Sequence, residues 1–295
     1  MSMIKREVAW RIFASEFNQS TLECGGEEER SPSYIVTPLG AMVNRLYVVG
    51  VLTETENMGT PEEPMYRARV TDPTGTYFIS AGQYQPQVAT ALAEMEPPSF
   101  VAVVGKASMY SPDEETKLVS IRGEHITEVT EEQRDYWILE ASKSLKKRLE
   151  AAVEASKMED VSVEELMDLG YDTKLAEGLK KAADHYQEFP TDRYWTYLED
   201  SLRYVLPEYE SPTAEEIKEE SSEEEVDEEV EESILEILEE MEDSDGGNGV
   251  EYEKVMDKVV DEEDITQDEF EEAINSLRTT GKIYEPVLGN IKRIY

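Results

Sequence analysis

The sequence has few of the residues that metal-dependent and thiol enzymes use. Its 295 residues include one cysteine and two histidines. A single cysteine excludes a disulfide within the chain, and Cys24 lies in a glycine-rich stretch with no histidine near it in sequence. His125 and His185 are too far apart to form a zinc-ligand pattern. We therefore expect no metal ion and no other cofactor.

The familiar catalytic motifs are missing as well. The sequence contains no P-loop, no HExxH and no GxSxG. A run of four carboxylates at 261–264 resembles a metal site in composition, but a charge run at a helix boundary is usually a solvated surface. The sequence predicts a protein that is not an enzyme.

Long apolar runs are also lacking. No run approaches the 18 residues of a membrane-spanning helix, so we expect no membrane partner. The first ten residues, "MSMIKREVAW", do not combine a basic region with a following apolar region, so we expect no signal peptide and a cytoplasmic protein.

Positive charge is scarce and unevenly distributed. Lys and Arg number 28 against 68 Asp and Glu, a formal net charge of −40. Residues 33–130 carry −6, residues 211–232 carry −11, and residues 233–295 carry −12. Such acidity is typical of proteins that stay hydrated in a salty cytoplasm, and it is also typical of acidic adaptors. Charge alone leaves both interpretations open.

The pattern of apolar residues predicts a multidomain β plus α protein. Helical spacing over 3–17 predicts a helix, and the polar stretch after it predicts a loop that completes residues 1–32. Residues 33–130 contain five strand-like runs, with a short helix at 86–95 between the third and the fourth. A glycine, Gly50, lies in the middle of the first run, where a strand bends easily. This order is typical of an OB-fold, a five-stranded barrel. The strands are expected at 45–54, 63–72, 75–82, 99–110 and 116–129.

The remainder of the sequence changes to helical periodicity. Residues 131–210 predict a helical region, and residues 211–232 are too acidic and too poor in apolar residues to fold, so we predict a disordered linker. Residues 233–295 predict three helices and a hairpin that turns at 288–290, the pattern of a winged helix. The helices of the middle region are expected at 131–156, 162–170, 173–187 and 191–205.

Several stretches together suggest a family. "REVAWRIFASEFNQST", "YIVTPLGAMVNRLYVVGVLTE", "RARVTDPTGTYFISAGQYQPQ" and "PPSFVAVVGKASMY" resemble the archaeal replication protein A-associated proteins over residues 5–140. The C-terminal part, through "TTGKIYEP", is similar to the winged helix of the middle subunit of eukaryotic replication protein A. The resemblance implies a part in single-stranded-DNA binding during replication and repair, in a complex with replication protein A-type subunits.

The alternation of side chains along the strands predicts a DNA-binding face. It places Arg67 and Arg69 on the outer face of one strand, and it favours Phe78 as exposed and Tyr77 as core. Cations that bind phosphates, together with aromatic rings that stack bases, form the usual single-strand site. The simpler alternatives are solvated arginines and aromatic residues that belong to the core or to a subunit contact. The candidate nucleic-acid-binding residues are Arg45, Arg67, Arg69, Phe78, Tyr84, Lys106 and Tyr110.

Two protein-binding surfaces are also predicted. An apolar stripe on the helix from residue 131 is expected either to mediate oligomerisation or to pack on the helices of 162–205. The acidic third helix of the C-terminal module should repel duplex DNA, so we expect the module to bind replication or repair proteins. An adaptor that binds only proteins, and a transcription regulator, are the alternative functions. The stripe consists of Tyr136, Leu139, Leu145, Leu149 and Val153.

Overall fold

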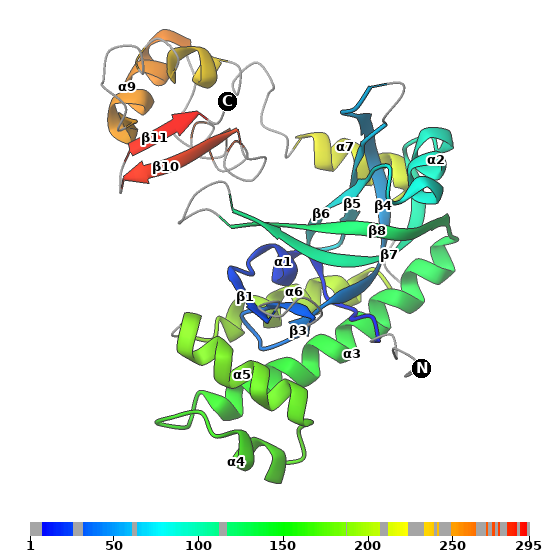
Figure 1. Cartoon of the computed structure of the whole chain (residues 1–295), viewed down its shortest axis with the longest axis vertical. Coiled ribbons are helices and arrows are strands. Elements are labelled where there is room, and N and C mark those ends of the chain that lie inside the picture. The colour runs from blue at the N-terminus through cyan, green and yellow to red at the C-terminus, as the bar shows by residue number, and fades with distance from the viewer. Residues whose placement is uncertain are drawn as a thin grey trace. The chain divides into compact units, whose positions relative to one another are not determined.

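The computed structural model of the chain contains two compact units, residues 1–110 with 119–218 and residues 111–118 with 219–295 (Figure 1). The described residues are 8–25, 32–60, 64–111, 117–186, 188–206, 212–223, 233–238, 241, 249–263, 270, 273–274, 277, 282–287 and 290–293.

A closed five-stranded barrel forms the centre of the first unit. Helix α2 (Pro86–Glu94) lies between the third and fourth barrel strands along the chain. The strands close in the order β4-β5-β6-β8-β7, with β6 and β8 parallel and the other registered pairs antiparallel. This is a mixed, OB-like barrel with one inserted helix, and all five predicted strands are confirmed. The strands are β4 (Arg45–Asn57), β5 (Tyr66–Asp72), β6 (Gly75–Ala81), β7 (Ser99–Tyr110) and β8 (Leu118–Glu128).

Gly50 lies where β4 passes very close to β5. A Cβ atom at this position would overlap the carbonyl oxygen of Thr71. The register of β4 on β5 also shifts between Leu52 and Glu54, which is the signature of a bulge. The predicted bend of this strand therefore has a steric reason, because only glycine fits at the crossing.

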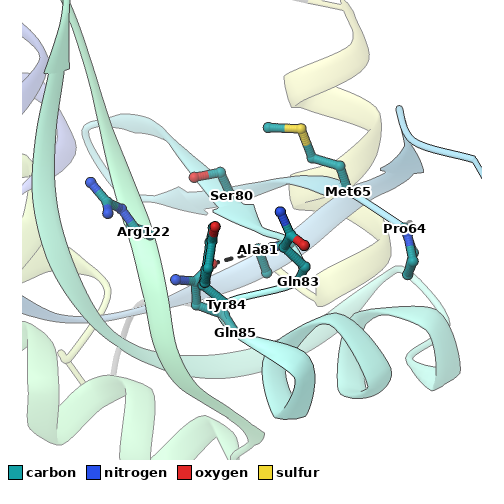
Figure 2. A pocket seen from close by; sticks show the side chains of 9 residues that line it. Pro64, Met65, Ser80, Ala81, Gln83, Tyr84, Gln85 and Arg122 are labelled. Atoms are coloured by element: carbon teal, nitrogen blue, oxygen red, sulfur yellow. Dashed lines mark hydrogen bonds between the residues drawn. The ribbon is translucent and has the colours of Figure 1, made fainter. Parts of the chain in front are cut away.

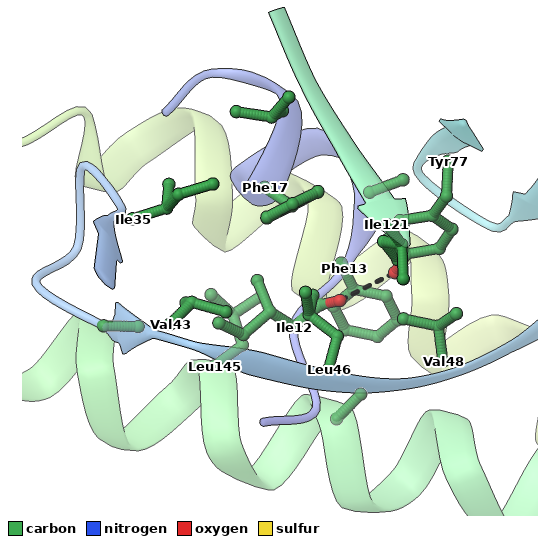
Figure 3. Packing of buried hydrophobic residues seen from close by; sticks show 14 of the residues in the cluster. Ile12, Phe13, Phe17, Ile35, Val43, Leu46, Val48, Tyr77, Ile121 and Leu145 are labelled. Atoms are coloured by element: carbon green, nitrogen blue, oxygen red, sulfur yellow. Dashed lines mark hydrogen bonds between the residues drawn. The ribbon is translucent and has the colours of Figure 1, made fainter. Parts of the chain in front are cut away.

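The barrel interior is filled by alternate side chains of its strands (Figure 3). Tyr77 and Ile79 on β6 are fully buried, as is Ile121 on β8. Phe78 between them is half-buried, so the prediction of Tyr77 as core is confirmed, whereas Phe78 lies on the outer face but is less exposed than predicted. The Tyr77 hydroxyl lies 2.6 Å from the carbonyl oxygen of Ile12, which ties the N-terminal segment to the barrel.

The turn between β5 and β6 is fixed by a buried carboxylate. Asp72 accepts hydrogen bonds from the backbone and the hydroxyl of Thr74 at 2.7 and 2.8 Å, and from the backbone of Ala14 at 2.8 Å. Burial raises the pKa of Asp72, and the hydrogen bond from Tyr77 acts in the opposite direction. Gly75 closes the turn with φ of 148°.

The N-terminal segment differs from the prediction. Residues 8–13 are not helical. Trp10 pairs with β4: its backbone amide donates to the carbonyl of Arg45 and its carbonyl accepts from the amide of Tyr47, both at 2.8 Å. The helix is confined to α1 (Ala14–Asn18), so the helix expected over 3–17 is wrong for 8–13, while residues 1–7 lie outside the described residues. Pairing to the barrel outweighs the helical periodicity here.

A small second sheet follows α1 in the chain. β1 (Leu22–Gly25), β2 (Ser33–Val36) and β3 (Met42–Val43) pair in the order β1-β2-β3, all antiparallel. The loop predicted for 18–32 is therefore wrong where β1 forms.

Four helices complete the fold of this unit, as predicted from the periodicity. A capping box of Thr130 and Gln133 starts the longest one, which packs against the barrel. The Trp137 indole on it donates to the carbonyl of Tyr47 on β4 at 2.8 Å, so barrel and helices share one hydrophobic core. The helices are α3 (Glu131–Ala155), α4 (Val163–Asp168), α5 (Thr173–Tyr186) and α6 (Thr191–Arg203).

A buried ion pair joins the N-terminal segment to α3. Glu16 and Arg148 are 0% and 1% exposed, and the Arg148 Nη2 atom lies 2.6 Å from Glu16 Oε2. Glu16 also accepts a 2.7 Å hydrogen bond from Thr37, and Arg148 donates to Ser144 at 2.6 Å. Both charges therefore have partners inside the core.

The segment predicted to be a disordered linker contains a helix, α7 (Ala214–Glu223). A capping box begins it: the Thr213 amide donates to Glu216 at 2.7 Å, and the Glu216 amide donates to Thr213 at 3.2 Å. The prediction is wrong for these residues, and 224–232 lie outside the described residues.

The C-terminal unit has its own hydrophobic core, which includes Ile234, Val255, Phe270 and Ile291. Helical residues at 233–238 are followed by β9 (Val250–Glu251), α9 (Tyr252–Glu263), helical residues between 270 and 277, β10 (Ile283–Val287) and β11 (Asn290–Arg293). The sheet order is β10-β11-β9, and the predicted hairpin is confirmed by the pairing of β10 with β11.

Across the part of the chain that the structure describes, no helix combines the length and the apolar character needed to cross a membrane.

Candidate nucleic-acid interface

Cationic side chains form a row across the outside of the barrel. Arg67 on β5 pairs in register with Ser80 on β6, and Ser80 pairs with Arg122 on β8. The next strand passes close by, because a Cβ atom on Gly105 of β7 would lie 2.5 Å from the carbonyl oxygen of Arg122. The residue after that glycine, Lys106, pairs with Arg45 on β4. Five neighbouring strands thus contribute to one row that runs across their direction.

We call Arg45, Arg67, Arg69, Lys106 and Arg122 the basic belt. Strands in a sheet lie about 4.8 Å apart, so the four steps from β5 through β6, β8 and β7 to β4 follow about 19 Å around the closed barrel, in which β4 and β5 are themselves paired. Residues 33–130 contain six cations, and five of them lie in the belt. Four of the five belong to the row, and Arg69 lies two residues along β5 from Arg67, although the segment as a whole is acidic.

Carboxylates neutralise part of the belt. Arg69 forms a 3.0 Å ion pair with Glu54, and Arg45 forms a 2.7 Å ion pair with Glu124. Arg67, Lys106 and Arg122 are exposed, and their side chains form no hydrogen bond or ion pair with any described residue. These three side chains are therefore the belt cations best placed to meet a phosphate.

The predicted aromatic residues lie in different places. Phe78 lies next to Arg69, whose guanidinium carbon is 6.0 Å from the ring centre, so this ring already has a cationic neighbour. Tyr84 is 84% exposed in the turn after β6. Tyr110 is 64% exposed at the end of β7, four residues from Lys106, which is about 13 Å along a strand. The structure therefore brings Tyr84 close to the belt and separates Tyr110 from it.

A hollow lies beside the belt where β6 ends (Figure 2). It has a volume of about 340 Å³. Figure 2 shows the Tyr84 ring between the side chains of Arg122 and Gln83, with Ser80 facing the same space. Two hydrogen bonds hold the turn that carries Tyr84. The backbone amide of Gln85 donates to the carbonyl of Gly82 at 2.8 Å, and the backbone amide of Gly82 donates to the side-chain oxygen of Gln85 at 3.3 Å. The lining residues are Pro64, Met65, Ser80, Ala81, Gly82, Gln83, Tyr84, Gln85 and Arg122.

Sequence reasoning missed Arg122, although the signal is present. Val119, Ile121 and Gly123 are buried, so the alternation of β8 places Arg122 on the outer face. Its neighbours could not be predicted in this way, because the parallel pairing of β6 with β8 is a tertiary contact.

The stripe predicted for oligomerisation is partly buried and partly exposed in the structure. Leu145 and Leu149 are 1% and 0% exposed, because α3 buries them in the core of its own unit. The prediction that they contact a partner is therefore wrong for this conformation, and the alternative of internal packing holds for both. Tyr136 and Leu139 remain 65% and 39% exposed, and Val153 is half-buried.

Metal binding finds no support in the described part of the chain, where no three His, Cys, Asp or Glu side chains cluster as ligands. Cys24 is half-buried, and burial raises the pKa of its thiol. A thiol with a raised pKa is a poor nucleophile.

No family model and no curated protein matches the sequence. Among solved structures, the chain is similar to one in a replication protein A heterotrimer bound to single-stranded DNA, with 15% identity, a TM-score of 0.35, and coverage of 48% of this chain and 98% of that one. It is also similar to a chain of the Stn1–Ten1 complex of S. pombe, with 13% identity, a TM-score of 0.37, and coverage of 46% and 90%. A third similarity is to the second single-stranded-DNA-binding protein of Mycobacterium smegmatis, with 18% identity, a TM-score of 0.25, and coverage of 29% and 86%.

Proposed function

We propose that this protein is a non-enzymatic subunit of an archaeal replication protein A-type complex that binds single-stranded DNA in replication and repair. The basic belt is the observation that carries the proposal. It places four of the six cations of residues 33–130 on one row of adjacent strands in an acidic protein, with a fifth, Arg69, two residues along β5 from Arg67. A row of cations across the strands of a small barrel suits the backbone of a single strand.

Affinity of the isolated chain should be weak. Binding to DNA gains free energy from the counterions that clustered cations release from phosphates. Glu54 and Glu124 already pair with two of the five belt cations, so few remain for phosphates. Partner subunits would supply the additional contacts, and the belt would contribute a part of the track.

Charge reversal of Arg67 and Arg122 tests the belt. Both are exposed, so Arg67→Glu with Arg122→Glu should leave the fold intact. Anisotropy of a labelled single-stranded oligonucleotide, titrated with full-length protein over a series of salt concentrations, gives affinity and salt slope. Loss of two phosphate contacts should flatten the slope by about 1.4, since each contact contributes about 0.7 on a single strand.

The control reverses two exposed lysines outside the belt, Lys146→Glu and Lys181→Glu, which changes the net charge by the same amount. It separates a local effect from general repulsion. Equal losses in both double variants would refute a role for the belt. Absence of any binding by the wild-type chain at low salt would favour the adaptor that binds only proteins.

We further propose that residues 233–295 form a winged helix that recruits other proteins. The order helix, strand, helix, helix and two strands supports this proposal. The module carries a net charge of −12, which opposes binding to duplex DNA. Pull-down with the full-length chain and with a chain ending at residue 218 would identify its protein partners, which should be lost on truncation.

Tyr136 and Leu139 are the part of the α3 stripe that remains available to a partner subunit. Both side chains lie on the exposed face of the helix, next to the barrel that α3 covers. Tyr136→Glu with Leu139→Glu should release partner subunits in a mass measurement of the complex while leaving unit folding unchanged. If the complex of this double variant stays intact, Tyr136 and Leu139 do not form the contact with a partner subunit.

A further inference from the structure

The hollow beside Tyr84 combines features that the belt itself lacks. Belt residues offer only cations in a line, whereas the hollow has a concave shape and a volume of about 340 Å³. Pockets of a few hundred cubic ångströms that hold small ligands pair an apolar lining with a few polar groups that fix orientation. Pro64, Met65 and the Tyr84 ring supply the apolar part here.

The polar groups in the hollow have unused hydrogen-bonding capacity. The Ser80 hydroxyl, the Gln83 amide and the Arg122 guanidinium make no hydrogen bond with any other described residue. An amide both donates and accepts, which matches the edge of a nucleobase, and a guanidinium matches a phosphate. These groups surround a tyrosine ring that is 84% exposed (Figure 2).

The position of the hollow favours a nucleotide over other small planar ligands. Ser80 and Arg122 line the hollow and also occupy adjacent places in the row across the barrel. A strand whose phosphates follow the belt therefore passes the mouth of the hollow. Two hydrogen bonds between Gly82 and Gln85 hold the turn, so the backbone that carries the Tyr84 ring is fixed beside the hollow.

We propose that this hollow is a base-binding pocket that receives one unstacked nucleobase of the bound strand, stacked on Tyr84, with Gln83 at its edge and Arg122 at its phosphate. The inference rests on the proposed single-strand binding and adds a fixed register to it. Continuous stacking on the belt would tolerate sliding of the strand, whereas a pocket for one base holds one nucleotide at a defined place.

An abasic scan tests the pocket. Full-length protein is titrated into labelled single-stranded 12-mers of mixed sequence, each with one abasic residue at a different position. One position should lower the affinity by about 5- to 150-fold, corresponding to the about 1–3 kcal/mol of one stacked base. Tyr84→Ala should lower the affinity for the intact 12-mer by a similar factor. An abasic residue at the sensitive position should then lower the affinity of this variant no further. Tyr84→Phe should restore the wild-type profile, because the ring and not the hydroxyl stacks.

Leu169→Ala is the control, since it removes an exposed apolar side chain at the end of α4, outside every proposed binding surface. It should keep the wild-type affinity and the wild-type scan. A flat scan with tight binding of the intact 12-mer, or a Tyr84→Ala loss that is the same at every position, would overturn the pocket and leave single-strand binding standing. Absence of binding to the intact 12-mer would overturn both.

Discussion

Removing Arg148 should strongly destabilise the first unit. Arg148→Met leaves the Glu16 carboxylate fully buried with only the Thr37 hydroxyl as a partner. Breaking one side of a buried pair costs about 3–5 kcal/mol, because the remaining charge is desolvated and uncompensated. The native state of a domain is stable by only about 5–15 kcal/mol, so this loss is easily measured.

Replacing both partners should restore most of the stability. Glu16→Leu with Arg148→Met removes both charges and should lie within about 1–2 kcal/mol of the wild type, the remainder arising from the hydrogen bond that Thr37 loses. Lys147→Met is the matched control. Lys147 lies on the same helix as Arg148, and its replacement breaks an exposed 2.8 Å pair with Asp172, just before α5, which should cost at most about 1 kcal/mol.

Urea unfolding followed by tryptophan fluorescence measures these variants in the full-length chain. All three tryptophans of the sequence lie in the first unit, so the signal reports this unit alone. A loss below about 1 kcal/mol for Arg148→Met, equal to the Lys147→Met control, would refute the buried-charge reasoning. A double variant as unstable as the single one would show that packing, and not charge, is responsible.

Three further outcomes are expected. Gly50→Ala should destabilise the first unit in the same urea assay, because its Cβ atom would overlap the carbonyl oxygen of Thr71. If this variant is as stable as the wild type, the close approach of β4 to β5 at Gly50 is refuted. Burial raises the pKa of Asp72 above its ordinary value of 3.8, so the wild type should lose stability relative to Asp72→Asn as the pH rises through the raised pKa; a constant difference would contradict this. Deleting 219–295 removes 28 acidic and six basic residues, so single-strand affinity by anisotropy should stay equal or rise; a clear fall would place DNA contacts in that segment.

The strands of the barrel were predictable because each buries one face and therefore alternates in sequence. Helix α3 was predictable from its apolar spacing, but the spacing could not identify what covers the stripe. Leu145 packs inside its own unit and Tyr136 does not, although both belong to the same periodic set.

The N-terminal segment shows where local pattern fails. Ile12, Phe13 and Phe17 belong to the helical pattern, yet the first two lie outside α1 and all three are buried. Pairing of Trp10 with β4 decides their conformation, and no local signal in the sequence indicates a partner 36 residues later at Leu46. The belt was only partly predictable for the same reason, since its row depends on which strands lie side by side.

The N-terminal segment is also bound to some of the last residues of its unit. The Thr21 amide donates to the Tyr186 hydroxyl at 2.9 Å, and the side chains of Gln19 and Tyr194 lie 2.8 Å apart, 175 residues from each other in sequence. At about 5–20 residues per second, a ribosome needs roughly 9–35 s to translate that interval. Gln19 and Thr21 emerge first and remain for that time without the tyrosines of α5 and α6 with which they finally form hydrogen bonds. The order of synthesis therefore runs against the order of contacts, and these contacts form only after α6 has left the ribosome.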